Sequence, residues 1–250
     1  MQDDSDDIIR ALRAPDQRSC GRMAGGMGAT ATDRLTALDA AAEGLRVWNP
    51  MLIPGLLQTT LYATATIKAR TPSLPGDEVA VRMQSRLFRS ENFLRRMAEP
   101  GDSHAWFILG EAALTQSVTN ADFHAHQLEH LLGIIDTYPR VRVRVLPDDA
   151  STAGNIEPFS IHALANGSRV GHLETIVGGW YTTRSEDVTR LYSAFAVLGK
   201  WALEPQETER VIEQCLRECR ARSGGAPDSP SPRTAIPTVA CSLPALPPAP

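Results

Sequence analysis

Two histidines and a glutamate lie at a spacing that could bind zinc. In the stretch 126–130, HQLEH, the histidines are four residues apart, so a helix would place both on one face. The H-x-x-E-H order occurs in zinc peptidases, where the metal also needs a third protein ligand and a carboxylate that activates water. The sequence does not place the residues that could supply these: His104, His162, His172 and Glu174. Since a chain with six histidines can produce this match by chance, we predict no metal site.

Two glutamates beside apolar stretches are further candidates for chemistry. Glu111 follows the apolar run WFILG, and Glu174 lies between Leu173 and Thr175. Either carboxylate could face a pocket that perturbs its pKa. Alternatively, Glu111 begins the helix EAALTQS, where an acid favours the free backbone amides, and Glu174 faces solvent. The chain has no G-x-S-x-G, no G-x-x-x-x-G-K-[ST] phosphate loop and no strand followed by G-x-G-x-x-G, so we expect no cofactor.

The stretch 49–63, NPMLIPGLLQTTLYA, combines an apolar turn with uncharged polar groups. A helix that starts at Pro54-Gly55 leaves its first N–H groups without partners, and the polar side chains that follow add donors and acceptors. Apolar walls with a few convergent polar groups are typical of a binding pocket. The same features also fit a helix start packed into the core. The candidate binding residues here are Leu56, Leu57, Gln58, Thr59 and Tyr62.

Composition indicates an ordinary globular protein. Of the 250 residues, 42% are hydrophobic and 22% are charged, and the net charge of −4 gives no basic footprint for nucleic acid. The start MQDDSDDIIR is unlike a secretory signal, and no apolar run is long enough to span a membrane. The four cysteines have neither a disulfide framework nor a zinc spacing, which favours reduced thiols in the cytoplasm.

Hydrophobic periodicity predicts an α+β fold, with helices packed on a small, at least partly antiparallel sheet. Residues 1–33 are acidic and glycine-rich and 223–250 are proline-rich, so we expect both to be disordered around a domain at 34–222. The predicted helices are 33–48 with Asp33 as N-cap, 54–69, 75–98, 121–138, 185–203 and 204–219. The predicted strands are 105–111, the alternating VRVRVLP at 141–147, and a hairpin of 159–164 and 169–175 that turns at Asn166-Gly167.

The corner belongs to a longer pattern. Residues 48–63 read W-x-P-x-L-x-P-G-L-L-Q-T-x-x-Y-A, which resembles the signature of an actinobacterial regulator family. In that family a domain of unknown function follows an XRE-type helix-turn-helix. The similarity covers roughly 40–210 and continues in five places: Q-L-x-x-L-L at 127–132, VRVRVLP at 141–147, P-F at 158–159, L-E-T at 173–175 and SEDVTRLYSAFAVLGKWALEPQET at 185–208.

The resemblance implies a cytoplasmic, antitoxin-like transcriptional regulator with roles in development and antibiotic production. The partner it implies is a small protein encoded by the adjacent gene, or a paralogous full-length regulator. Only 33 residues, acidic and glycine-rich, precede the first matched helix, and such a segment cannot build a helix-turn-helix core. We therefore expect this chain to make no direct DNA contact and to retain only the sensing half.

Two hypotheses follow for the function. The first is a non-catalytic regulatory domain that binds a protein partner or a small ligand through the corner residues, together with Glu111, Glu174 and Trp180. The second is a recruited biosynthetic enzyme or small-molecule binder in which Glu111, Glu174 and His172 perform acid/base chemistry.

Overall fold

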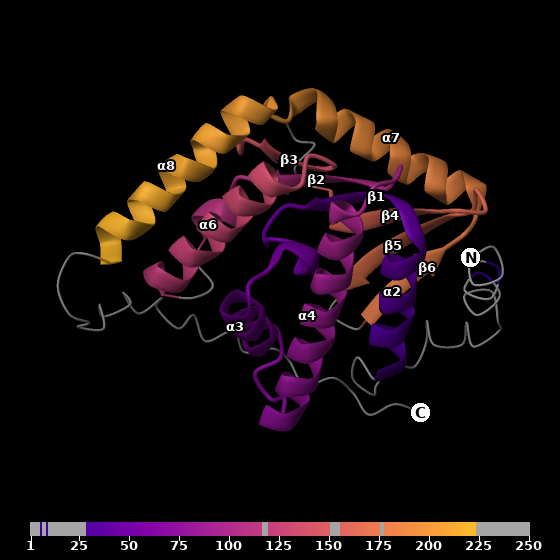
Figure 1. The fold of residues 1–250 in the computed structure, drawn as a ribbon, viewed down its shortest axis with the longest axis horizontal. Coiled ribbons are helices and arrows are strands. Elements are labelled where there is room, and N and C mark those ends of the chain that lie inside the picture. The colour runs from indigo at the N-terminus through magenta and orange to yellow at the C-terminus, as the bar shows by residue number, and fades with distance from the viewer. Residues whose placement is uncertain are drawn as a thin grey trace, which may run out of the picture.

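The computed structural model describes residues 6, 9, 29–116, 120–150, 156–175 and 178–223. Within these ranges helices pack on one six-stranded sheet (Figure 1), so the predicted α+β fold is confirmed. The elements are α2 (Ala29–Ala41), β1 (Ala42–Asn49), η2 (Gly55–Leu57), α3 (Thr60–Arg70), α4 (Gly76–Ala98), β2 (His104–Gly110), α5 (Ala112–Thr115), α6 (Ala121–Thr137), β3 (Val141–Leu146), β4 (Phe159–Leu164), β5 (Arg169–Thr175), β6 (Gly178–Thr182), α7 (Ser185–Trp201) and α8 (Pro205–Ser223). Each helix in these ranges is too short or too polar to cross a lipid bilayer. The segments 1–33 and 223–250, for which we predicted disorder, lie outside the described residues except at 6, 9, 29–33 and 223.

The sheet is mixed, with the strand order β3-β2-β1-β4-β5-β6. The pairs β1–β2 and β2–β3 are parallel, whereas β1–β4, β4–β5 and β5–β6 are antiparallel. The antiparallel half contains the predicted hairpin, and Gly167 in its turn has a φ of 79°, which glycine adopts without steric cost. Strand β6 extends this half and is absent from the sequence-based prediction.

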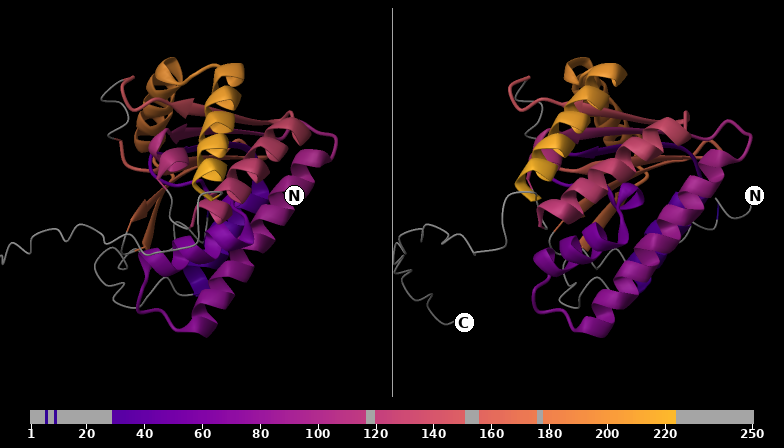
Figure 2. Two further views of the ribbon diagram at one scale, coloured as in Figure 1. Left: turned by 90° about the vertical axis from the view of Figure 1, so that its left-hand side faces the viewer. Right: turned by 60° about the vertical axis from the view of Figure 1, so that its left-hand side comes forward.

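The two larger apolar cores lie on opposite faces of the sheet. On one face α7 packs Val188, Phe195 and Leu198 against Trp48 and Ile161. On the other face α4, α6 and α8 share a larger core with the strands β1, β2 and β3. Helices α2 and α3 pack against α4 on this second side, as Figures 1 and 2 show. The β4–β5–β6 half of the sheet therefore faces α2 and α4.

Strand β3 follows its alternating sequence. Val141, Val143 and Val145 point to one side, as the alternation predicts, and they are buried in the larger core. The two arginines point to the α7 side, where the guanidinium of Arg142 lies 5.1 Å from the ring centroid of Trp106. Because successive side chains of a strand point to opposite faces, the valines of β3 face the apolar core and its arginines face the α7 side.

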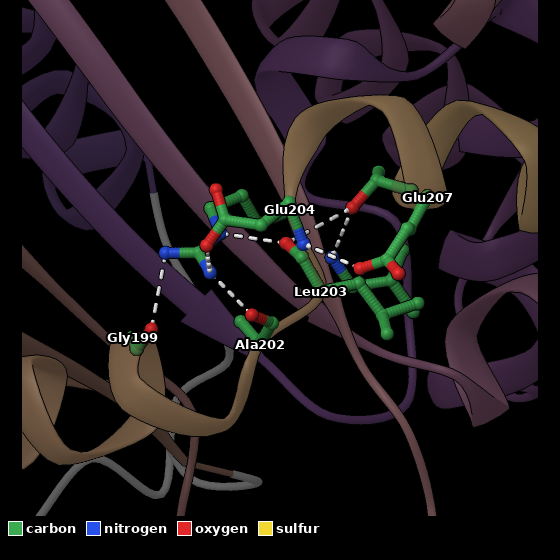
Figure 3. Close-up of polar contacts among 8 residues, drawn as sticks. Gly199, Ala202, Leu203, Glu204 and Glu207 are labelled. Atoms are coloured by element: carbon green, nitrogen blue, oxygen red, sulfur yellow. Dashed lines mark hydrogen bonds and ion pairs between the residues drawn. The ribbon is translucent and has the colours of Figure 1, made fainter.

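The second arginine of β3 joins the sheet to the junction between α7 and α8 (Figure 3). Arg144 Nε donates to the carbonyl oxygen of Leu203 at 2.7 Å and Nη1 to that of Gly199 at 3.0 Å. Its Nη2 donates to the carbonyl of Ala202 and, at 3.0 Å, to the carboxylate of Glu204. One cation thus satisfies carbonyl groups that the end of α7 would otherwise leave without partners.

Two predicted elements are wrong in part. Residues 33–48 were expected to form one helix, but α2 starts at Ala29, so Asp33 is not its N-cap, and the chain becomes β1 at Ala42. Pairing with β2 and β4 on both sides and the low helix propensity of Gly44 favour the strand. The helix expected from Pro54 is instead the short 3₁₀ turn η2 followed by α3. The side chain of Thr59 caps α3 by accepting from the N–H of Tyr62.

Candidate functional site

The corner 54–59 is packed into the protein and also forms one wall of a cavity. Leu57 and Tyr62 are 0% exposed. Gln58 donates through Nε2 to the carbonyl of Ile53 at 2.6 Å, and Gln127 bridges the carbonyl of Leu57 and the N–H of Thr59 at 2.8 and 2.7 Å. These bonds satisfy the groups that the 3₁₀ turn leaves free. The five candidates at this corner therefore form no exposed surface, although Leu56 lines the cavity.

The cavity lies between the sheet and the helices α2, α3 and α4. It consists of two hollows, of about 90 and 100 Å³, which adjoin because both are lined by Leu35, Arg89, His172 and Glu174. The first hollow reaches the corner at Pro54 and Gly55, and the second extends towards the end of α3. Side chains distant in the sequence thus meet in one place.

A buried ionic network connects the helices to the sheet in the first hollow. One oxygen of Asp39 on α2 lies 2.9 Å from Nε2 of His162 on β4, and the other accepts from Nε of Arg89 on α4 at 2.7 Å. Burial alone would raise the pKa of Asp39, but the cation and the hydrogen bonds outweigh it and lower the pKa to about 2. Because Asp39 is ionised, Nε2 of His162 is the donor. Nδ1 of His162 is buried and has no hydrogen-bond partner among the described residues.

Strand β5 contributes His172 and Glu174, which both face the cavity. The ring of His172 stacks on Tyr181 at a centroid distance of 4.7 Å, and its Nδ1 lies 3.4 Å from the hydroxyl oxygen of Ser160. Burial, reinforced by the charge of His162, lowers the pKa of His172 to about 4, so the ring is neutral at pH 7. Glu174 accepts from Nη1 of Arg70 at 3.1 Å.

Four arginines surround the second hollow. Arg82, Arg86 and Arg89 occupy one face of α4, at spacings of four and three residues, and Arg70 lies at the end of α3. Burial lowers the pKa of Arg86 to about 10, an effect that Glu174 opposes and the other three arginines reinforce. Arg86 is therefore a cation at neutral pH, and Nη1 donates to Oε1 of Gln58 at 2.8 Å.

The other predicted residues lie apart from this cavity. Glu111 is at the end of β2, where its carboxylate accepts from the N–H of Asp148 at 3.2 Å. Trp180 is 43% exposed and precedes Tyr181 on β6, so the two side chains point to opposite faces. The structure brings His172 and Glu174 together, as the acid/base hypothesis requires, but it separates both from Glu111.

The H-x-x-E-H stretch lies on α6, away from the cavity. His126 is exposed, and Glu129 forms an ion pair with Arg220 of α8. In the part of the chain that the structure describes, His, Cys, Asp and Glu form no group of three that could bind a metal ion.

Sequence reasoning named His162 only as a possible zinc ligand, and it missed Asp39 and the four arginines around the second hollow. The arginine spacing in 82–89 is a visible signal, because positions four and three residues apart share one face of the helix predicted for 75–98. The contact between Asp39 and His162 spans 123 positions in the sequence, and no local pattern indicates it.

A family model described as "Domain of unknown function (DUF5753)" matches residues 32–214. The matched region contains most of α2 and everything from β1 to α7, so it includes the whole cavity. No curated protein and no solved structure matches the chain at a significant level.

Proposed function

The chain belongs to the DUF5753 family, and we propose that it is the non-catalytic regulatory domain of an XRE-type, antitoxin-like transcriptional regulator that binds a small ligand in its cavity. It acts in the cytoplasm of an actinobacterium. Ligand binding in the cavity changes its interaction with a protein partner. That partner is a small protein encoded by the adjacent gene or a paralogous full-length regulator. We propose that the described residues contact neither DNA nor a membrane.

The observation that carries the proposal is a cavity whose polar groups come from two layers of the fold. Arg86 and Arg89 belong to the helical layer, whereas His172 and Glu174 belong to the sheet. A ligand that contacts both layers binds more tightly to one arrangement of them than to another. Such a difference in affinity is what a ligand needs in order to shift a conformational equilibrium.

The charged groups in the cavity favour binding over catalysis. Both oxygens of Asp39 accept hydrogen bonds, and Glu174 is paired with Arg70. With a pKa of about 4, His172 is a neutral imidazole at pH 7, so it supplies no imidazolium acid and is only a weak base. The alternative, a recruited biosynthetic enzyme, has less support because Glu111 lies outside the cavity.

A cavity-blocking variant tests the proposal. Leu35 lines both hollows, so Leu35→Trp fills them, whereas Val81→Trp adds the same side chain at a position that is 62% exposed. The Tm of each protein is measured with one metabolite added at a time, taken from neutral, cationic and anionic compounds. We expect at least one compound to raise Tm for the native chain and Val81→Trp but not for Leu35→Trp, and to be recovered unchanged. If none raises Tm, ligand binding is refuted; if the compound is converted, the chain is an enzyme.

The regulatory part of the proposal has a separate test. The small protein encoded beside this gene is titrated into the chain with and without the compound that raises Tm. Linkage requires the compound to change the affinity for that protein by the same factor by which the protein changes the affinity for the compound. An affinity for the partner that the compound leaves unchanged would contradict regulation through this cavity.

A further inference from the structure

The positive charges around the second hollow exceed the negative charges that neutralise them. Arg89 is paired with Asp39 at 2.7 Å, and Arg70 with Glu174 at 3.1 Å. Arg82 has only Glu78, at 3.9 Å and with a side chain that is 56% exposed. Arg86 donates to the neutral Gln58. Among the described residues, Arg86 thus forms no ion pair, and Arg82 forms only this long one with a partly exposed carboxylate.

One of these groups also has an unused donor inside the protein. Nη1 of Arg82 is buried and has no hydrogen-bond partner among the residues that the structure describes. A buried donor without an acceptor is costly, and the cost is larger for a charged group. An acceptor supplied from outside the chain would remove this cost.

Arg82 and Arg86 are positioned to bind the same ligand. They are four residues apart on α4, so their side chains leave the same face of the helix, and both line the second hollow. Tyr181 lines the same space; burial raises its pKa to about 12, so it remains a neutral hydroxyl that can donate. A planar guanidinium matches the paired oxygens of a carboxylate or a phosphate.

We infer that the cavity binds a compact anion whose carboxylate or phosphate oxygens are held by Arg82 and Arg86. This inference rests on the proposed ligand-binding function and specifies the chemical class of the ligand. Cationic compounds are excluded from the second hollow by the arginines, and neutral compounds leave the Nη1 donor of Arg82 with a weaker acceptor than a charged oxygen.

Titration calorimetry with defined probes tests the inference. Malonate supplies two carboxylates, pyrophosphate supplies phosphate oxygens, and malonamide is a neutral analogue of malonate. The variants are Arg82→Gln, Arg86→Gln and, as a matched control, Arg95→Gln on an exposed part of α4. Arg82→Gln is the main variant because Arg82 makes only one long ion pair, whereas Arg86 also holds Gln58. Circular dichroism checks that each variant is folded.

We expect malonate or pyrophosphate to bind the native chain and Arg95→Gln equally, and the Arg82→Gln variant about 10- to 100-fold more weakly. The tighter of the two anions identifies the group as a carboxylate or a phosphate. If both anions bind Arg82→Gln with the same affinity as Arg95→Gln, the inference is overturned, because anion binding then does not depend on Arg82. If malonamide or another neutral metabolite binds and neither anion does, the inference is also overturned, but the proposed function is not. If no compound of any class binds, both fail.

Discussion

Arginines serve two different purposes in this molecule, at the α7–α8 junction and in the cavity. At the junction Arg144 directs every nitrogen of its guanidinium at an oxygen of the chain itself: three backbone carbonyls and Glu204 (Figure 3). In the cavity Arg82 has a buried nitrogen with no acceptor among the described residues, and Arg86 donates to a neutral amide. The residue type is the same, but at the junction every guanidinium nitrogen has an acceptor, whereas Arg82 in the cavity keeps one buried nitrogen without an acceptor among the described residues.

The contrast indicates which arginines stabilise the fold and which are available to a ligand. A buried cation whose hydrogen bonds are all made stabilises the structure around it. A buried cation with an unused donor lowers the unfolding free energy of the unliganded protein. This loss of stability is reversed when a bound ligand supplies an acceptor. Arg89 is intermediate, because it lines the cavity but is satisfied by Asp39. Four predictions test these roles of the buried charged and titratable groups, in order of decreasing effect.

Asp39→Asn should cause the largest loss of stability. The change leaves Arg89 buried without its counter-charge, and breaking a buried ion pair typically costs roughly 3–5 kcal/mol of unfolding free energy. Urea denaturation measures the loss. Asp136→Asn, on an exposed part of α6, is the control and should change stability by less than about 0.5 kcal/mol. Equal stability of the two variants would show that Arg89 does not depend on Asp39.

Arg144→Ala should lower the free energy of unfolding by about 3 kcal/mol, because several carbonyls at the end of α7 lose a charged donor. Arg142→Ala on the same strand removes only an exposed contact with the ring of Trp106, worth about 0.5–1 kcal/mol. Neither change should affect the affinity for an anion. A weaker affinity in folded Arg144→Ala would break the proposed division between the two kinds of arginine.

The protein should lose stability in mild acid because of His172. Its pKa is about 4 in the folded protein and near 6.5 in the unfolded chain, so the unfolded chain binds the proton first as the pH falls. The contribution of His172 should lower the unfolding free energy by about 2 kcal/mol between pH 7.5 and pH 5, and this contribution should level off below pH 4. Asp39, with a pKa of about 2, contributes only at lower pH. Denaturation of His172→Gln across this range should show a flatter dependence; an equal slope would refute the assignment.

The sequence predicts elements better than it predicts their contacts. The alternation in 141–147 and the Asn166-Gly167 turn predict β3 and the hairpin because both signals are local. The helix predicted for 33–48 fails because apolar residues at helical spacing continue across the boundary into β1, where pairing with two neighbouring strands decides the conformation.

The cavity depends on contacts that no local pattern encodes. The corner 54–59 is recognisable, and His172 and Glu174 were candidates, but the partners that complete the site come from α2 and α4. Whether the arginines of α4 face solvent or the sheet depends on how that helix is rotated against its neighbours, which only the folded chain shows. For the same reason the sequence does not distinguish Glu111 from Glu174, although the structure separates them.

The smallest and most discriminating effect is expected for Arg82→Gln without ligand. Removing a buried cation with an unused donor should leave the unfolding free energy unchanged or raise it by up to about 1 kcal/mol, the opposite sign to Arg144→Ala. Adding the bound anion at about 100 times its Kd should then stabilise the native chain by about 2.7 kcal/mol and the variant much less. Arg95→Gln serves as the control and should follow the native chain in both conditions. A loss of several kcal/mol in Arg82→Gln without ligand would mean that this arginine, like Arg144, is satisfied within the fold.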